Sequence, residues 1–240
     1  MTGMIRLIAL ALCALLALTR APAKAEDGGP VDLELVLALD ASGSVDMMEW
    51  RQQAQGYAQA FTNPQVIQAI LAGRHRSIAV TMFQWSGYAL QAPMVPWTRI
   101  HDTASAQAFA EAVVDARRVI FGGGTSLSGA IDYGMRQFGR GFAGTRKVID
   151  VSGDGSNNNG RPPMFARDAA VKAGITINGL AILNDEPRLD SYYLDYVIGG
   201  ANAFVMSAPD YETFGRAILN KLLIEIAGIP PARPLLAAQE

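Results

Sequence analysis

The chain has 240 residues, of which 20 are Lys or Arg, 22 are Asp or Glu, two are His and one is Cys, and half are hydrophobic. This composition excludes a disordered chain, and the length suffices to bury a core without disulfide bonds. A formal net charge of −2 provides no basic surface for nucleic acid. A single Cys can form neither an internal disulfide nor a cysteine-based zinc site, and two His leave little room for a His-rich metal centre.

The amino-terminal 25 residues are expected to be an export signal. Arg6 supplies the basic start, an apolar run follows at 7–18, and the Ala-Lys-Ala at 23–25 has the small-x-small pattern that precedes cleavage. The alternative is a membrane anchor, but an apolar run of about 12 residues is shorter than the roughly 20 that span a bilayer. Cys13 does not indicate a lipoprotein, because Leu12 precedes it where a small residue would be expected.

Cleavage of this segment changes the protein that has to be interpreted. The segment carries three basic residues and no acidic ones, so its removal leaves 215 residues with a net charge of −5 and no Cys. We therefore expect a periplasmic or extracellular protein without disulfides and without stable membrane insertion after cleavage. The predicted organisation is a signal peptide at 1–25, one domain at 26–228 and a flexible, Pro-containing tail at 229–240.

Short apolar runs alternate with helical patterns along the predicted domain. The runs expected to form strands are 31–39, 77–85, 93–97, 147–151, 175–183 and 203–206. The segments expected to form helices are 46–61, 103–116, 126–138, 162–173, 189–197 and 211–226. This alternation predicts parallel βαβ units, and strands this apolar indicate burial on both faces. The sequence therefore predicts a single doubly wound α/β domain, with a mostly parallel sheet flanked by helices.

Three polar, glycine-containing loops stand at the ends of these elements. Residues 40–44 (Asp-Ala-Ser-Gly-Ser) follow the first strand, 122–126 (Gly-Gly-Gly-Thr-Ser) precede a helix, and 152–155 (Ser-Gly-Asp-Gly) follow the strand at 147–151. Ligands of open parallel sheets bind beyond the carboxyl ends of the strands. We therefore expect the three loops to meet at one edge of the sheet.

The polar side chains of these loops offer only oxygen, and we expect them to form a metal site. The candidate ligands are Asp40, Ser42, Ser44, Thr125 and Asp154. Alternate residues of an extended loop point to the same side, so the first three can face one ion together. Two carboxylates and three hydroxyls suit a hard divalent cation such as Mg²⁺, with Mn²⁺ or Ca²⁺ as alternatives. Such an ion keeps waters, one of which a carboxylate from a partner protein can replace.

These three motifs, in this order, resemble the metal-ion-dependent adhesion site of a von Willebrand factor A (vWA) domain, and the resemblance extends over residues 31–227. It implies that Ser42, Ser44 and Thr125 contact the metal directly and that Asp40 and Asp154 often act through water. It also implies a secreted vWA-like module that binds a protein ligand presenting an acidic side chain. The last helix, at 211–226, would then shift when the metal shell changes. One departure is that the third loop reads Ser-Gly-Asp-Gly, where many A domains have Thr or Ser directly before the Asp.

Enzymatic interpretations of the same loops are less well supported. The glycine-rich loop lacks the Lys of a Walker-type phosphate loop. A serine hydrolase needs a nucleophile elbow and a partner His, whereas His75 and His101 are expected in surface loops. A phosphatase with Asp40 as nucleophile would need a second Asp at position 42, which is Ser. We therefore expect a binding module rather than an enzyme, and a phosphoesterase-like, metal-dependent hydrolase is the alternative.

Two further groups of residues have alternative roles. Asp46 is expected to cap the helix that follows it, with a place next to the metal as the alternative. Aromatic residues near the second and third strands are expected to pack in or beside the core rather than to form a recognition surface; they are Phe83, Trp85, Tyr88 and Trp97.

Overall fold

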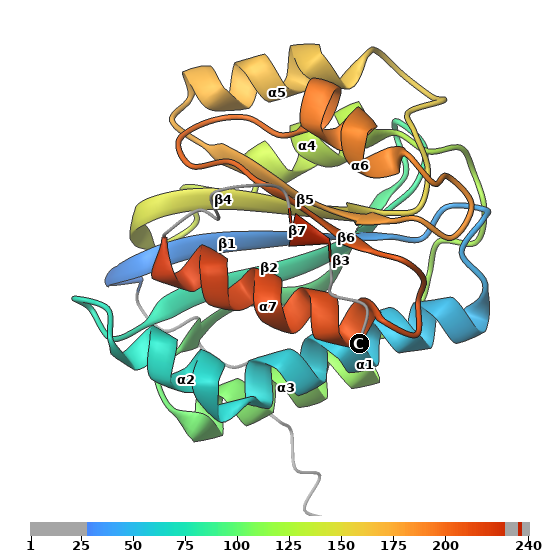
Figure 1. Cartoon of the computed structure of the whole chain (residues 1–240). Helices are drawn as coiled ribbons and strands as arrows, with labels where there is room; N and C mark the ends of the chain where they lie inside the picture. Colours follow the sequence, from blue (N-terminus) through green and yellow to red (C-terminus); the bar gives the residue numbers. More distant parts are fainter. Residues whose placement is uncertain (1–27, 229–234, 237–240) are drawn as a thin grey trace, which may run out of the picture.

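The computed structural model describes residues 28–228 and 235–236, which form one seven-stranded sheet with helices on both faces (Figure 1). The strands are β1 (Pro30–Asp40), β2 (Ile78–Trp85), β3 (Gln91–Ile100), β4 (Ala143–Gly153), β5 (Thr176–Ile182), β6 (Val205–Ala208) and β7 (Leu235–Leu236). The helices are α1 (Met47–Thr62), α2 (Pro64–Leu71), α3 (Thr103–Asp115), α4 (Leu127–Met135), α5 (Pro163–Lys172), α6 (Leu189–Tyr192), the π-helical turn η1 (Tyr193–Val197) and α7 (Phe214–Ala227).

The strand order confirms the predicted doubly wound sheet. Along the sheet the order is β3-β2-β1-β4-β5-β6-β7, and every neighbouring pair is parallel except β2 with β3. The first strand therefore lies near the middle, where it pairs with β2 on one side and with β4 on the other. Its last residue, Asp40, is in register with Trp85 at the end of β2.

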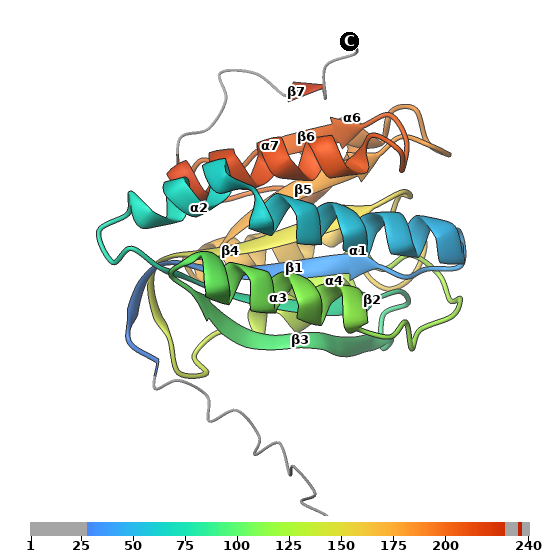
Figure 2. The same cartoon turned by 90° about the horizontal axis from the view of Figure 1, so that it is seen from below.

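Both faces of the sheet are buried, as the apolar strands predict. Alternate side chains of β1 point to opposite faces: Leu33, Leu35, Leu37 and Leu39 pack under α1, α2, α3 and α7, whereas Val36 and Ala38 pack under α4, α5 and α6. Figure 2 shows α1, α3 and α7 side by side over one face. Because helices cover both faces of the sheet, polar groups gather at the strand ends and in the loops that follow them.

Several elements differ from the sequence prediction. No element is predicted for 64–71, yet Pro64 begins α2, because Asn63 caps it by accepting a hydrogen bond from Gln65 N at 2.8 Å and Pro is favoured in a first helical turn. The strand predicted at 93–97 is twice as long in the structure and antiparallel. Its prolines are tolerated because β3 is an edge strand.

Other boundaries move by a few residues. The helix predicted at 126–138 ends at Met135, the last helix begins at Phe214 rather than at 211, and the helix predicted at 189–197 divides into α6 and the π-helical turn. The predicted signal peptide at 1–25 lies outside the described residues. Of the predicted tail at 229–240, only Leu235–Leu236 is described, and it pairs with Met206 and Ser207 of β6. No helix in the described part of the chain is long and apolar enough to cross a membrane.

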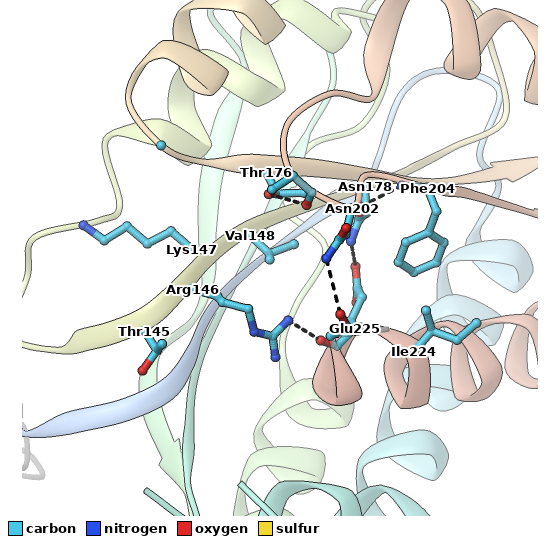
Figure 3. Close-up of a pocket in the computed structure, with 13 residues that line it drawn as sticks. Thr145, Arg146, Lys147, Val148, Thr176, Asn178, Asn202, Phe204, Ile224 and Glu225 are labelled. Atoms are coloured by element: carbon cyan, nitrogen blue, oxygen red, sulfur yellow. Dashed lines mark hydrogen bonds between the residues drawn. The ribbon is translucent and has the colours of Figure 1, made fainter. Parts of the chain in front are cut away.

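The last helix is fixed to the sheet by buried charges. Lys221 Nζ lies 2.7 Å from Asp150 Oδ1 on β4 and 2.6 Å from Glu225 Oε1 one turn along, and all three side chains are buried. Asn178 on β5 donates to the same Glu225 oxygen at 2.9 Å. Arg146 donates to the main-chain carbonyl of Glu225 at 2.6 Å and so caps the end of α7 (Figure 3). Arg146, Asn178 and Glu225 border a cavity of about 240 Å³ at the amino-terminal ends of β4 and β5.

Candidate metal site

The three predicted loops meet at the carboxyl ends of β1 and β4, on the right-hand side of the sheet in Figure 1. The first and second loops touch through their backbones, because Gly43 N donates to Gly123 O at 3.4 Å. The end of β2 supports the second loop, since Ser86 Oγ donates to Gly122 O at 2.7 Å and Ser86 O accepts from Ser126 N at 2.9 Å. The expectation that the loops share one edge is therefore correct.

Asp40 fixes the shape of the first loop. It is fully buried, and its Oδ1 accepts a hydrogen bond from Ser42 N at 2.7 Å, which turns the chain sharply after β1. Its main-chain carbonyl accepts from Gln53 Nε2 of α1 at 3.2 Å. The end of β1 and helix α1 thus both hold the first loop in place, and Ser42 and Ser44 extend from this turn.

The two serines connect the first loop to the third. Ser42 Oγ and Ser44 Oγ lie 3.1 Å apart, and Ser44 Oγ donates to Asp154 Oδ1 at 2.9 Å. The other oxygen of Asp154 accepts a hydrogen bond from the Tyr211 hydroxyl at 2.9 Å. Residues 110 positions apart in the sequence therefore form one continuous set of oxygen atoms.

Thr125 joins this set from the second loop. Its backbone is clasped by Asn158, whose side-chain oxygen accepts from Thr125 N at 2.8 Å and whose N–H donates to Thr125 O at 2.9 Å. A Cβ placed on Gly155 would lie 3.7 Å from Thr125 Oγ1, so the hydroxyl faces the residue next to Asp154. The structure thus brings Asp40, Ser42, Ser44 and Asp154 together and places the Thr125 hydroxyl beside the residue that follows Asp154, with the third loop orienting Thr125.

The two carboxylates of the site lack a positive counter-charge. Asp40 Oδ2 is buried and makes no hydrogen bond within the described part of the chain, and no ion pair found there involves Asp40 or Asp154. Burial, followed by repulsion from Asp154, raises the pKa of Asp40 to about 7. Burial also raises the pKa of Asp154. A divalent cation would supply the missing charge and reverse both effects, so the donor set fits such an ion.

Close packing under the site excludes side chains at Gly153. A Cβ there would lie 2.8 Å from Asp40 Oδ2, 2.9 Å from the Tyr193 hydroxyl and 3.2 Å from the Trp85 ring. Only glycine lets the end of β4 approach these groups so closely. The floor of the site is therefore formed by two buried aromatic side chains and one unpaired carboxylate oxygen.

Arg118 supports the site, although no sequence motif marks it. Its guanidinium donates to the main-chain carbonyls of Ala41 and Ser42, both at 3.2 Å, and to that of Asp46 at 3.1 Å. Its Nε donates to Ile120 O at 2.8 Å, so one side chain joins the first and second loops. Tyr211 and Asn158 are likewise missed from sequence, because only tertiary contacts reveal them.

The secondary predictions have mixed outcomes. Asp46 caps α1, as expected: its Oδ1 accepts from Met48 N and Glu49 N, and its own N–H donates to the Glu49 carboxylate at 2.7 Å. Phe83 and Trp85 are buried and Trp97 is partly buried, as expected, whereas Tyr88 is half exposed and its ring lies against Gly160. His75 and His101 lie in loops, as expected.

The fold is that of solved vWA-type structures. The proximal thread matrix protein 1 of the mussel byssus, in a structure described as having a zinc-occupied MIDAS motif, matches with a TM-score of 0.58 and 16% identity over 83% of this chain and 49% of that chain. The von Willebrand factor type A protein from Catenulispora acidiphila matches with 0.58 and 18% over 83% and 43%. The conserved hypothetical protein BatB from Bacteroides thetaiotaomicron matches with 0.51 and 17% over 82% and 99%.

The chain spans about half the length of the mussel protein structures that it matches. Identities this low show the fold alone. At the level of sequence, residues 30–230 match the family described as "Protein of unknown function (DUF1194)", and the chain belongs to that family. No curated protein matches the chain.

Proposed function

We propose that this protein is an exported vWA-like binding module, periplasmic or extracellular, that holds a divalent cation and uses it to bind a protein partner. The proposed ligands are Asp40, Ser42, Ser44, Thr125 and Asp154. The observation that carries the proposal is the buried, unpaired Asp40 Oδ2 beside a second carboxylate without a cationic partner in the described residues. Burial of such a group is costly unless a positive charge compensates it.

Oxygen-only ligands favour Mg²⁺, with Mn²⁺ or Ca²⁺ as alternatives. When bound, the cation provides an electrophilic position that a carboxylate from another protein can occupy. The residues of this chain hold that position in place: the Asp40 turn fixes both serines, Tyr211 orients Asp154, and Asn158 orients Thr125. The mussel protein structure with a zinc-occupied motif lends support, because it has the same fold.

We further propose that the module is not an enzyme. The hydroxyls and carboxylates of the site bond to one another, and neither His is part of it: His75 N donates to Asp32 near the start of β1, and His101 precedes α3. A panel of phosphate mono- and diesters tests this with Mg²⁺ or Mn²⁺ present. Metal-dependent turnover that Ser42→Ala abolishes would establish the hydrolase alternative.

Calorimetric titration with Mg²⁺ and Mn²⁺ tests the metal site. We expect saturable 1:1 binding by the wild type and a loss of at least about tenfold in affinity for Asp40→Asn and Thr125→Val, because each removes a ligand or its charge. Asp168→Asn is the control, since Asp168 is an exposed residue of α5 that pairs with its neighbour Arg167. Equal binding by the wild type and by both site variants, with unchanged circular dichroism, would exclude the site.

A further inference from the structure

The surface around the candidate metal site is apolar on one side. Six large hydrophobic residues there are between 43 and 71% exposed, and all come from the three segments beside the first two loops. These residues, called the apolar rim, are Met47, Met48, Tyr88, Leu90, Val119 and Phe121. Scattered exposed hydrophobic residues are ordinary, but a group of them beside a polar site is typical of a protein-binding surface.

Contacts place the apolar rim directly against the site. Phe121 packs on Arg118, with 5.4 Å between the guanidinium carbon and the ring centre, and the same Arg118 holds the carbonyl of Ser42. A Cβ at Gly123 would lie 3.0 Å from a Leu90 methyl. Met48 stands in the first turn of α1, where its N–H is capped by Asp46. The rim therefore borders the first and second loops.

The third loop faces an acidic segment instead. Both oxygens of Glu186 accept hydrogen bonds from Ser156, at 2.7 Å from its N–H and 2.8 Å from its hydroxyl, two residues after Asp154. Asp185 is exposed and directly precedes Glu186, so it lies on the same side of the third loop. Residues 184–190 contain three acidic side chains and one basic one. The side of the candidate site next to the third loop is thus acidic, whereas the side next to the first two loops carries the apolar rim.

We propose that the partner is a protein segment with an acidic residue between apolar and basic side chains. The carboxylate would complete the metal shell, the apolar side chains would pack on the apolar rim, and the basic side chain would face Asp185. This inference rests on the proposed function, because the carboxylate needs the bound cation. What the inference adds is the type and the order of the side chains that flank the partner's acidic residue. These follow from the positions of the apolar rim and of the acidic residues at 184–190.

Capped synthetic peptides test the inference on the full-length mature protein loaded with Mn²⁺. The probe peptide is Ser-Leu-Phe-Asp-Lys-Ser, and its relatives replace Leu-Phe by Ser-Ser, Lys by Glu, or Asp by Asn. Fluorescence anisotropy measures peptide affinity, and calorimetry separately measures Mn²⁺ affinity. We expect the probe peptide to bind about tenfold more tightly than either flank variant, and the Asn peptide not to bind.

Protein variants assign the effect to the apolar rim. Met48→Ser combined with Phe121→Ser should remove the advantage of the Leu-Phe peptide over the Ser-Ser peptide and leave Mn²⁺ affinity unchanged. Val171→Ser is the matched control, because Val171 is an exposed apolar residue near the end of α5, at the other edge of the sheet. Asp185→Asn should remove the preference for Lys over Glu.

The outcomes separate the two proposals. If Asp-containing peptides bind only with metal but regardless of their flanks, the inference is wrong and the proposed function stands. If the Asn peptide binds as well as the Asp peptide, or if no peptide binds the Mn²⁺-loaded protein, both proposals are wrong, because both require a carboxylate of the partner to bind the cation. Self-association in sedimentation that requires Met48 and Phe121 would assign the apolar rim to a second copy of this chain and overturn the inference.

Discussion

Tyr211 donates a hydrogen bond to Asp154 Oδ2 at 2.9 Å, across 57 positions of sequence. Asp154 lies in the third loop of the candidate site, whereas Tyr211 lies three residues before α7. The contact therefore connects the site to the segment that leads into the last helix. It also occupies one of the two oxygens of a carboxylate whose other oxygen bonds to Ser44.

Tyr211→Phe should weaken metal binding without unfolding the protein. The hydroxyl lowers the pKa of Asp154, so its removal makes the carboxylate harder to ionise and less well oriented. We expect about a fivefold loss of Mn²⁺ affinity, equivalent to about 1 kcal/mol, and a larger loss at pH 6 than at pH 8. Calorimetry at both pH values measures it, and Tyr88→Phe is the control at an exposed Tyr. If the loss of affinity does not depend on pH, the Tyr211 hydroxyl orients Asp154 but does not affect its ionisation.

Gly153→Ala should damage both the site and the fold. The added methyl would meet Asp40 Oδ2 and the Tyr193 hydroxyl at less than 3 Å, so β4 or Asp40 must move. We expect a destabilisation of about 1–3 kcal/mol in urea unfolding together with weaker metal binding. Gly155→Ala is the control two residues away, because its Cβ would be 3.7 Å or more from its nearest neighbours. Equal effects of the two substitutions would mean that the packing at Gly153 does not constrain the site.

The candidate ligands could be found from the sequence because each stands in a short contiguous motif at a strand or helix boundary. Asp40, Ser42 and Ser44 share one loop, and chain order alone places that loop beside the loops of Thr125 and Asp154. The residues that support them have no such signal. Arg118, Asn158 and Tyr211 act through contacts between loops far apart in the sequence, which appear only when the sheet is folded.

The fold class and the alternation of strands and helices were predictable from the sequence, and errors occurred where tertiary context outweighs local pattern. Pro64 reads as a helix end in sequence, but it begins α2. The last helix shows an apolar stripe at every fourth residue from Phe214, and helical periodicity places the charged residues Lys221 and Glu225 on the same face. In the structure both are buried, because Asp150 on the central strand β4 provides a partner that no local pattern reveals.

Lys221→Met should destabilise the protein strongly. The substitution keeps much of the side-chain volume but leaves Asp150 and Glu225 buried without their cation. Loss of one partner of a buried ion pair typically costs about 3–5 kcal/mol. Urea unfolding at pH 7 measures the change, with Lys172→Met on the exposed face of α5 as control. Addition of Glu225→Gln and Asp150→Asn to Lys221→Met should recover part of the loss, and a single-variant cost within the error of the control would contradict the account.

The same cluster predicts how stability depends on pH. Burial, and then repulsion from Glu225, raises the pKa of Asp150 to about 7 from an ordinary value of 3.8. The folded protein therefore keeps a proton that the unfolded chain releases, and stability contributed by this group is lost as the pH rises from about 4 to 7. The slope is at most about 1.4 kcal/mol per pH unit for one proton. Urea unfolding of the metal-free protein between pH 5 and 8 should show this decline, and it should be smaller in Asp150→Asn, which does not titrate. If the two proteins lose stability in parallel, Asp150 is already ionised at pH 5 and Lys221 neutralises it fully.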